Sequence, residues 1–242
     1  MADPKKLTPL AENWQRALAV VAHPDDLEYG AASAVARWTS QGKFVAYLLA
    51  TRGEAGIDSL PPEAVGPLRE QEERNSARLV GVETVEFLNY PDGVIEYGLP
   101  LRRDIARAVR RQRPEVLITL NFELTWGGTI LNMADHRWLG LAVLDAARDA
   151  ANRWIFPQLL DEGLQPWDGV KKVLVAGSGN PTHGVDVTNF LERGIASLRA
   201  HRAYIDNLAG DFNAESFLKN NAAAAGKALG CKYAVAFEVI TI

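Results

Sequence analysis

The sequence has very little cysteine, and this limits the metal sites that it can build. Cys231 is the single cysteine among 242 residues, so the chain offers no internal disulfide and no pair of thiolates for a metal. Histidine is scarce too, with His23, His136, His183 and His201 making up the whole set. Any metal site must therefore combine some of these histidines with carboxylates.

Long apolar runs and a strong charge of one sign are also lacking. No stretch approaches the ~20 apolar residues of a membrane span, and the polar start MADPKKLTPLAENWQR does not resemble a signal peptide. Twenty-six Lys and Arg against thirty Asp and Glu give a net charge of −4, spread along the chain, which argues against nucleic acid as a partner. We expect a cytoplasmic protein that acts on a small molecule, and the sequence leaves a homo-oligomer open.

The apolar residues that are present predict one α/β domain. Nearly half of the chain (48%) is apolar, and no run rich in Gly, Ser or Pro divides it, so we expect a single domain over residues 1–242, with residues 1–14 as an N-terminal extension. Strands and helices alternate, which predicts a mostly parallel, Rossmann-like sheet with helices on both faces. The expected strands are 16–22, 44–50, 84–88, 116–120, 173–176 and 233–242, and the expected helices are 29–40, 68–79, 101–113, 136–152, 188–207 and 220–229.

Two of the expected helices carry many charged residues. The segment LREQEERNSARL, from Leu68 to Leu79, is typical of a solvated helix that turns Leu68, Ala77 and Leu79 toward the core. His201 lies within the long helix expected at 188–207, and we interpret it as a structural or partner-facing residue outside the site.

Polar clusters follow the first four expected strands. HPDD follows the first strand, TRGEAG the second, NYPDG the third, and the loop 121–135 the fourth. The carboxyl ends of parallel strands meet at one edge of the sheet, where ligands bind in such folds. The sequence therefore predicts a functional site at this edge.

The HPDD segment at 23–26 has the residues of a hydrolytic metal site. Such a site needs three ligands and leaves a fourth position for water. Proline fixes a turn that lets His23 and Asp26 converge on one ion, while Asp25 lies beside the water as a general base. His136 begins a helix at the same edge and is our third ligand. A structural reading stays open at this point, in which Asp135 or an aspartate of HPDD caps a helix.

These segments together resemble a known family. AHPDDLEYGAA, TRGEAG, REQEERNSARLVGV, LNYPDG and ADHR, in this order from residue 18 to 142, are similar to the LmbE-like or PIG-L zinc-dependent deacetylases. The resemblance implies a hydrolase that uses Zn²⁺, or another divalent metal such as Fe²⁺, to remove the acetyl group from an N-acetylglucosaminyl-type small molecule. Carried over residue by residue, it implies His23, Asp26 and His136 as metal ligands and Asp25 as the base.

Two more residues look like family members' sugar-binding groups. The resemblance implies that Arg52 of TRGEAG and Asp92 of NYPDG bind the substrate, since an arginine donates and a carboxylate accepts hydrogen bonds of sugar hydroxyls. The alternatives are a surface ion pair for Arg52 and a turn residue for Asp92.

One position departs from the family pattern. The third-ligand motif is commonly His-Pro-Asp-His, whereas this chain has Met133 at the first position, and a thioether cannot stabilise an oxyanion. We predict that His183, after a later strand, takes this catalytic role, with Asn132 and Trp126 as alternative donors.

The altered motif keeps two other functions open. One is an amidase that acts on a thiol S-conjugate, as in a related branch of the family. The other is a member that binds metal without catalysis, within a natural-product pathway.

Overall fold

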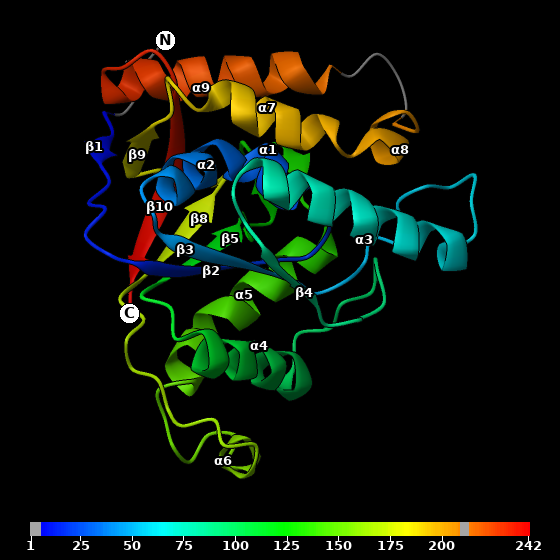
Figure 1. Ribbon diagram of the computed structural model, residues 1–242, viewed down its shortest axis with the longest axis vertical. Helices are drawn as coiled ribbons and strands as arrows, with labels where there is room; N and C mark the ends of the chain where they lie inside the picture. Colours follow the sequence, from blue (N-terminus) through cyan, green and yellow to red (C-terminus); the bar gives the residue numbers. More distant parts are fainter. Residues whose placement is uncertain (1–5, 209–212) are drawn as a thin grey trace.

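The computed structural model describes residues 6–208 and 213–242 and has the expected α/β architecture. Figure 1 shows the sheet in the middle of the molecule, with α1, α2, α3, α7 and α9 on one face and α4 and α5 on the other. This confirms the predicted fold class. Among the described helices, none combines the length and the apolar character needed to cross a membrane.

The bounds of the elements agree closely with the expected strands and less closely with the expected helices. The strands are β1 Thr8–Pro9, β2 Arg16–Val21, β3 Phe44–Leu49, β4 Thr84–Phe87, β5 Val116–Leu120, β6 Thr125–Trp126, β7 Ile130–Leu131, β8 Lys172–Ala176, β9 His183–Asp186 and β10 Ala234–Thr241. The helices are α1 Asp26–Gly30, α2 Ala32–Ser40, α3 Pro62–Leu79, α4 Leu99–Gln112, α5 Ala134–Asp149, α6 Gln158–Asp161, α7 Leu191–Arg199, α8 Arg202–Ile205 and α9 Ala214–Leu229.

The described residues form one eight-stranded sheet in the order β1-β9-β10-β8-β5-β2-β3-β4. Strands β8, β5, β2, β3 and β4 run parallel, so their carboxyl ends share one edge. β10 runs antiparallel to β8 and pairs Phe237 with Ala176. The first residues of β10 therefore lie at the edge where the parallel strands end.

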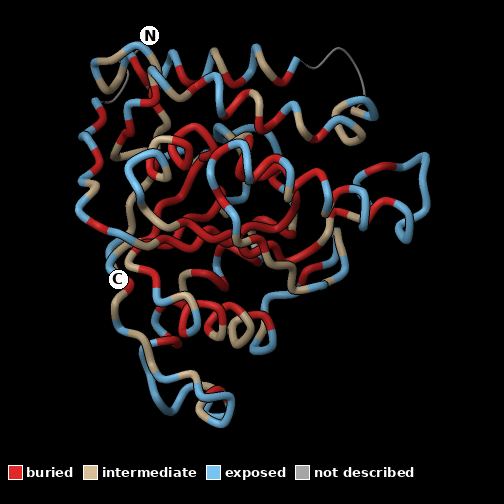
Figure 2. The backbone as a smooth tube through the Cα atoms, viewed as in Figure 1, coloured by how far each residue is buried: buried red, intermediate tan, exposed pale blue. Residues whose placement is uncertain are grey.

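Two hydrophobic cores cover the two faces of the sheet. Side chains alternate between the faces along a strand, and in β2 the residues Ala17 and Ala19 pack with α2, whereas Leu18 and Val20 pack with α4 and α5. Figure 2 shows the resulting band of buried residues through the middle of the molecule. Because β2 is buried on both faces, the turn that follows it is held from two sides.

Three parts of the chain differ from the sequence-based prediction. Residues 6–14 do not extend from the domain, because Thr8 pairs with His183 and the side chains of Leu7, Leu10 and Trp14 are buried; residues 1–5 lie outside the described part. The helix expected at 188–207 is divided into α7 and α8, with a break at residues 200–201. Strand β9, where a loop was expected, completes the sheet beside β10.

The prediction for the buried face of α3 is confirmed for Ala77, which is buried, and is wrong for Leu68 and Leu79. Leu68 and Leu79 are 37% and 45% exposed, whereas Arg69 and Glu73 are 2% and 0% exposed. Arg69 and Glu73 are four residues apart, so they share one face of the helix, and this polar face is the one that packs against the HPDD turn.

Candidate active site

A large cavity opens at the edge of the sheet where the parallel strands end. Its volume is about 1100 Å³. It is lined by His23, Asp25 and Asp26 after β2, by Asp92 after β4 and by His136 of α5. The site that the sequence predicts therefore lies in a cavity at the predicted edge.

The HPDD turn has an unusual backbone at Asp25. Its φ is 98°, in the left-handed region that residues other than glycine and asparagine rarely adopt, and such a conformation costs of order 1–3 kcal/mol. α3 stabilises the turn, because Arg69 donates to the carbonyl oxygen of Pro24 and the Asp25 amide donates to Oε2 of Glu73 at 3.3 Å. The strained turn lets Asp25 and Asp26 point in different directions.

Possible ligand atoms of His23, Asp26 and His136 lie close together, within 4.8 Å of one another. Nε2 of His136 lies 3.0 Å from Oδ1 of Asp26 and 3.2 Å from Nδ1 of His23, and Nδ1 of His23 lies 3.7 Å from Oδ2 of Asp26. All three side chains are buried. The structure thus brings together the three residues that the sequence predicts as ligands.

The other nitrogen of each histidine contacts an acceptor. Nε2 of His23 lies 3.1 Å from Oδ1 of Asp92 and 3.2 Å from Oδ2 of Asp135, and Nδ1 of His136 lies 2.9 Å from Oδ1 of Asn132. We infer from these partners that the proton of each ring is on the outer nitrogen. Nδ1 of His23 and Nε2 of His136 then present lone pairs to each other at 3.2 Å, an arrangement that a cation between them would stabilise.

Hydrogen bonds to one carboxylate oxygen fix the orientation of Asp26. Its Oδ2 accepts hydrogen bonds from the amides of Ala22 at 3.0 Å and His23 at 2.9 Å, which leaves Oδ1 toward His136. Burial works against ionisation of this carboxyl, but the histidines beside it hold the pKa of Asp26 well below its usual range. Each of the three residues therefore has a fixed outer contact and one inner donor atom.

The spacing of the inner atoms fits a first-row divalent metal. Four ligands at 2.0–2.1 Å around zinc lie about 3.4 Å apart in a tetrahedron, and Nε2 of His136 lies 3.0 Å from Oδ1 of Asp26 and 3.2 Å from Nδ1 of His23. The surroundings also favour a cation. Burial lowers the pKa of His23, but hydrogen bonds to the carboxylates of Asp135, Asp26 and Asp92 outweigh this and leave that pKa well above its usual value.

Neither helix start supports the structural reading of these aspartates. Asp25 precedes α1 without a capping hydrogen bond from its side chain, and the N-cap of α5 is Met133. Asp135 instead accepts the amides of Gly93 at 2.8 Å and Ile95 at 3.0 Å, which ties α5 to the loop after β4. Asp135 therefore orients His23 and joins two loops of the site.

Asp25 forms a buried ion pair that the sequence analysis missed. Nη2 of Arg69 lies 3.1 Å from Oδ1 of Asp25. Burial raises the pKa of Asp25 to about 6, and the Arg69 guanidinium opposes that rise. The guanidinium also stacks over the ring of Tyr204, with 4.1 Å from Cζ to the ring centroid. The carboxylate is thus held at the cavity without being a ligand.

A second buried cluster lies behind Asp25. Nε2 of His201 is 3.6 Å from Oε2 of Glu28 and 3.7 Å from Oε2 of Glu73, and Glu73 also accepts the Asp25 amide. Burial lowers the pKa of His201, but Glu28 and Glu73 more than reverse this and raise it to about 9. The histidine that the sequence left as structural or partner-facing is therefore buried in the protein interior, where it balances two carboxylates.

The structure does not bring Arg52 to the cavity. Arg69 lines the cavity instead. A Cβ at Gly53, whose φ is 63°, would lie 2.6 Å from Nη1 of Arg69, so the glycine makes room for this arginine. Arg52 lies against α3, where a Cβ at Gly66 would be 3.3 Å from its Cζ.

The three residues predicted to replace the missing family histidine differ in whether they reach the cavity. His183 begins β9, with Nδ1 2.8 Å from Oγ1 of Thr182, and it is not among the lining residues of the cavity. Asn132 is buried and donates to the carbonyls of Asn121 and Glu123. Trp126 does line the cavity, with its ring 5.8 Å from that of His136.

Comparisons with known proteins give the family of this chain and several of its relatives. The sequence model of the PIG-L family, described as GlcNAc-PI de-N-acetylase, matches residues 18–147, which is more than half of the chain. A diacetylchitobiose deacetylase from Thermococcus kodakarensis is 26% identical and is matched over 91% of this chain and 81% of its own length. A 1D-myo-inositol 2-acetamido-2-deoxy-alpha-D-glucopyranoside deacetylase from Kineococcus radiotolerans is 28% identical, over 84% of this chain and 73% of its own.

A solved structure extends the similarity to the whole fold. The N,N'-diacetylchitobiose deacetylase from Pyrococcus horikoshii, in complex with an inhibitor, is similar with a TM-score of 0.86 and 25% identity. The match covers 95% of this chain and 85% of that one. His23, Asp25, Asp26, Asp92 and His136 lie within the residues 18–147 that the family model matches.

Proposed function

This chain belongs to the PIG-L family, and we propose that it is a metal-dependent deacetylase that hydrolyses the acetamide of an N-acetylglucosaminyl-type small molecule. The observation that carries the proposal is the convergence of His23, Asp26 and His136 beside Asp25 in one cavity. We infer zinc as the metal, with Fe²⁺ as the alternative, because two imidazoles and one carboxylate are typical of hydrolytic zinc sites.

The chain's own residues supply the proton chemistry. A zinc ion held by His23, Asp26 and His136 would polarise the amide carbonyl and lower the pKa of water. Asp25 accepts the proton of the attacking water on a carboxylate oxygen and then delivers it to the departing amine. Arg69 holds that carboxylate at the cavity through its 3.1 Å contact.

Sugar binding is proposed for the loops after β3 and β4. Asp92 orients His23 and accepts the amide of Ala55 at 2.9 Å, and its remaining lone pairs are available for a sugar hydroxyl. Sequence resemblance alone supports Arg52 in this role, since Arg52 is not among the residues that line the cavity.

A substrate panel tests the proposed function. Zinc-loaded protein should release acetate from N-acetylglucosamine or diacetylchitobiose, and only slowly act on the amide of a thiol S-conjugate. The names of the relatives favour the first group of substrates. Faster cleavage of the S-conjugate would support the amidase, and bound zinc without cleavage of any panel member would support the metal-binding, non-catalytic alternative.

A further inference from the structure

The cavity continues well beyond the metal ligands. Its volume of about 1100 Å³ exceeds the range of about 300–1000 Å³ that is usual for small-molecule sites. The part remote from the ligands, which we call the apolar arm, is formed mainly by α7, α9 and the ends of β5 and β10. Its defining residues are Leu120, Leu191, Leu218, Ala222, Ala225 and Ala236.

The order of strands places the apolar arm on one side of the metal ligands. His23 and Asp26 follow β2, and β2 lies between β5 and β3. The lining residues Ala55, Gly56 and the polar Asp92 follow β3 and β4, on one side of β2. The loop after β8 and the start of β10 lie on the other side, with the apolar arm. A ligand that spans the cavity therefore passes from a polar end, across the ligands, to an apolar end.

The apolar arm is a built part of the interior. Leu191, Leu218 and Ala222 are buried with Ile195 and Leu198 in a cluster between α7 and α9. On the opposite wall, Leu120 packs closely against Gly30 of α1. A Cβ at Gly30 would lie 2.8 Å from Cδ1 of Leu120, so the glycine makes this close approach possible. Ser33, Ser178 and Asn221 also line the cavity, but the walls named here are aliphatic, and aliphatic walls favour a hydrocarbon over a sugar.

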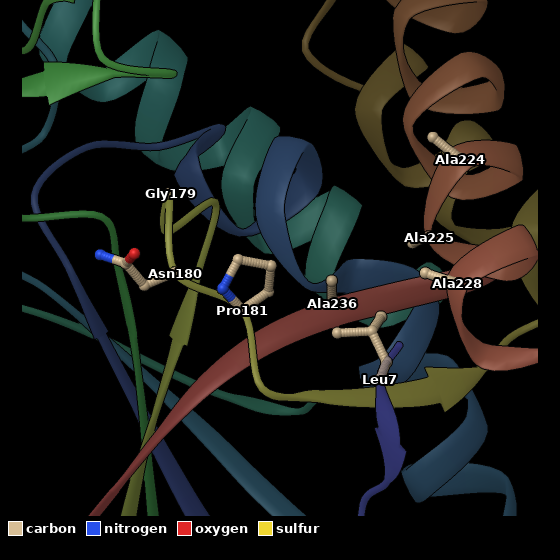
Figure 3. Close-up of a pocket in the computed structure, with 8 residues that line it drawn as sticks. All are labelled: Leu7, Gly179, Asn180, Pro181, Ala224, Ala225, Ala228 and Ala236. Carbon is tan, nitrogen blue, oxygen red and sulfur yellow. The ribbon is translucent and has the colours of Figure 1, made fainter. Parts of the chain in front are cut away.

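A smaller cavity continues in the same direction. It has a volume of about 370 Å³ and shares Gly179, Ala225 and Ala236 with the large cavity. Figure 3 shows Ala225 and Ala228 on α9, opposite Ala236 of β10 and the loop at Gly179. The short side chains leave space between α9 and β10 into which a chain end could extend from the apolar arm.

We propose that the apolar arm binds the acyl chain of the scissile amide, so that an amino sugar carrying a medium-length aliphatic N-acyl group is a better substrate than its N-acetyl counterpart. This inference rests on the proposed function. It follows from the strand order, because a sugar held at Asp92 and an amide carbonyl at the ligands direct the acyl chain toward β8 and β10. In the reaction water adds to the carbonyl carbon, the C–N bond breaks, the amine leaves with a proton, and the fatty acid remains.

A chain-length series of substrates tests the proposal. N-acetyl-, N-butanoyl-, N-hexanoyl- and N-octanoyl-glucosamine are compared by kcat/KM on the zinc-loaded protein. Burial of one methylene is worth up to about fourfold, so we expect a rise of at least about tenfold from N-acetyl to N-octanoyl. A flat or falling series would overturn the proposal, and so would an equal gain for octyl N-acetylglucosaminide, which carries its chain on the other side of the sugar.

Two matched variants test whether the acyl chain lies in the apolar arm. Ala225→Phe fills the arm at the boundary of the two cavities, whereas Ala223→Phe adds the same ring to an exposed position of α9 that lines neither. Ala225→Phe should lower the ratio of N-octanoyl to N-acetyl hydrolysis by about tenfold, and Ala223→Phe should keep the wild-type ratio. Equal ratios in all three proteins would contradict the assignment.

A binding measurement gives a readout without turnover. By calorimetry on metal-free protein, octanoate should bind at least about tenfold more tightly than acetate, and Ala225→Phe should remove the difference. Equal affinities in the wild type would overturn the proposal. The experiments distinguish failure of this proposal from failure of the proposed function. Hydrolysis of N-acetylglucosamine without a chain-length preference refutes only the binding of an acyl chain in the apolar arm. No hydrolysis of any amide in the series refutes the proposed function as well.

Discussion

Nη2 of Arg69 lies 3.1 Å from Oδ1 of Asp25, and both side chains are almost completely buried. A buried carboxylate is stable next to a charge of opposite sign and costly without it. The pair explains how Asp25 can carry a negative charge inside the protein while it is not a metal ligand.

Loss of the Arg69 guanidinium should make Asp25 a weaker acid. Since the guanidinium opposes the rise in the pKa of Asp25, Arg69→Gln should raise this pKa, and the acid limb of the kcat/KM profile should shift to higher pH. Removing one partner of a buried pair also costs about 3–5 kcal/mol of unfolding free energy. A pH–rate profile and a urea titration measure the two effects.

Arg78→Gln is the matched control for this prediction. Arg78 is also on α3, is exposed, and donates to Asn75, remote from the HPDD turn. It should leave both the profile and the stability near the wild type. An Arg69→Gln profile that coincides with that of Arg78→Gln would show that the ion pair does not set the pKa of Asp25.

The general base can be separated from the ligands by one substitution. Asp25→Asn keeps the size of the side chain but cannot accept a proton, so kcat/KM should fall by about 10²- to 10⁴-fold, while zinc content measured by atomic absorption stays at the wild-type level. His136→Ala is the contrasting variant, because it should lose metal and activity together. Turnover near the wild-type rate in Asp25→Asn would remove the base assignment.

The sequence and the structure make different predictions for His183. The sequence assigns it the role of the missing family histidine, whereas in the structure it begins β9 outside the cavity lining. On the geometry, His183→Ala should change kcat by less than about threefold, and Trp126→Phe, which alters a cavity wall, should lower it more. A loss of tenfold or more in His183→Ala, with the stability unchanged, would favour the sequence-based role.

The buried cluster around His201 predicts how stability depends on pH. Its pKa is raised from 6.5 to about 9 by Glu28 and Glu73 against the effect of burial, so its contribution is complete below pH 6.5 and is lost as the pH rises to 9. At ~1.4 kcal/mol per unit, the loss amounts to about 3 kcal/mol. Burial and Glu28 also raise the pKa of Glu73, and this likewise makes the folded protein less stable as the pH rises.

Titration of the imidazoles by NMR checks this assignment. The metal-loaded protein should show one imidazole with a midpoint near pH 9, and His201→Gln should lack that signal. Urea titrations of the wild type at pH 6.5 and pH 9 should show the lower stability at pH 9. A stability that is equal at both pH values, with no imidazole titrating above about pH 8, would contradict the interpretation.

The convergence of the three proposed metal ligands could be predicted from sequence because each follows a recognisable element. HPDD comes directly after a buried apolar strand, and His136 begins a helix after another strand of the same sheet, so topology brings them to one edge. A resemblance in ordered segments supported the same residues. The mostly parallel sheet with helices on both faces also followed from the alternation of apolar runs and helical patterns.

The residues that support the ligands could not be predicted in this way. Arg69 and Glu73 lie on a helix whose composition is typical of a solvated surface, and only the tertiary packing of α3 against the HPDD turn buries them. Arg52 was predicted from the resemblance of TRGEAG to the family, but Gly53 and Gly56 admit the more remote Arg69 at that place. Periodicity indicates which face of a helix is apolar, and it carries no signal for a buried polar face.

Metal dependence is the most direct test of the central claim that His23, Asp26 and His136 form a catalytic metal site. Chelator-treated protein is titrated with Zn²⁺ while acetate release from an N-acetylglucosaminyl substrate is measured. We predict that the treated protein is inactive and that activity rises to a plateau at one zinc per chain. Hydrolysis that persists at full rate after complete removal of the metal would contradict the account.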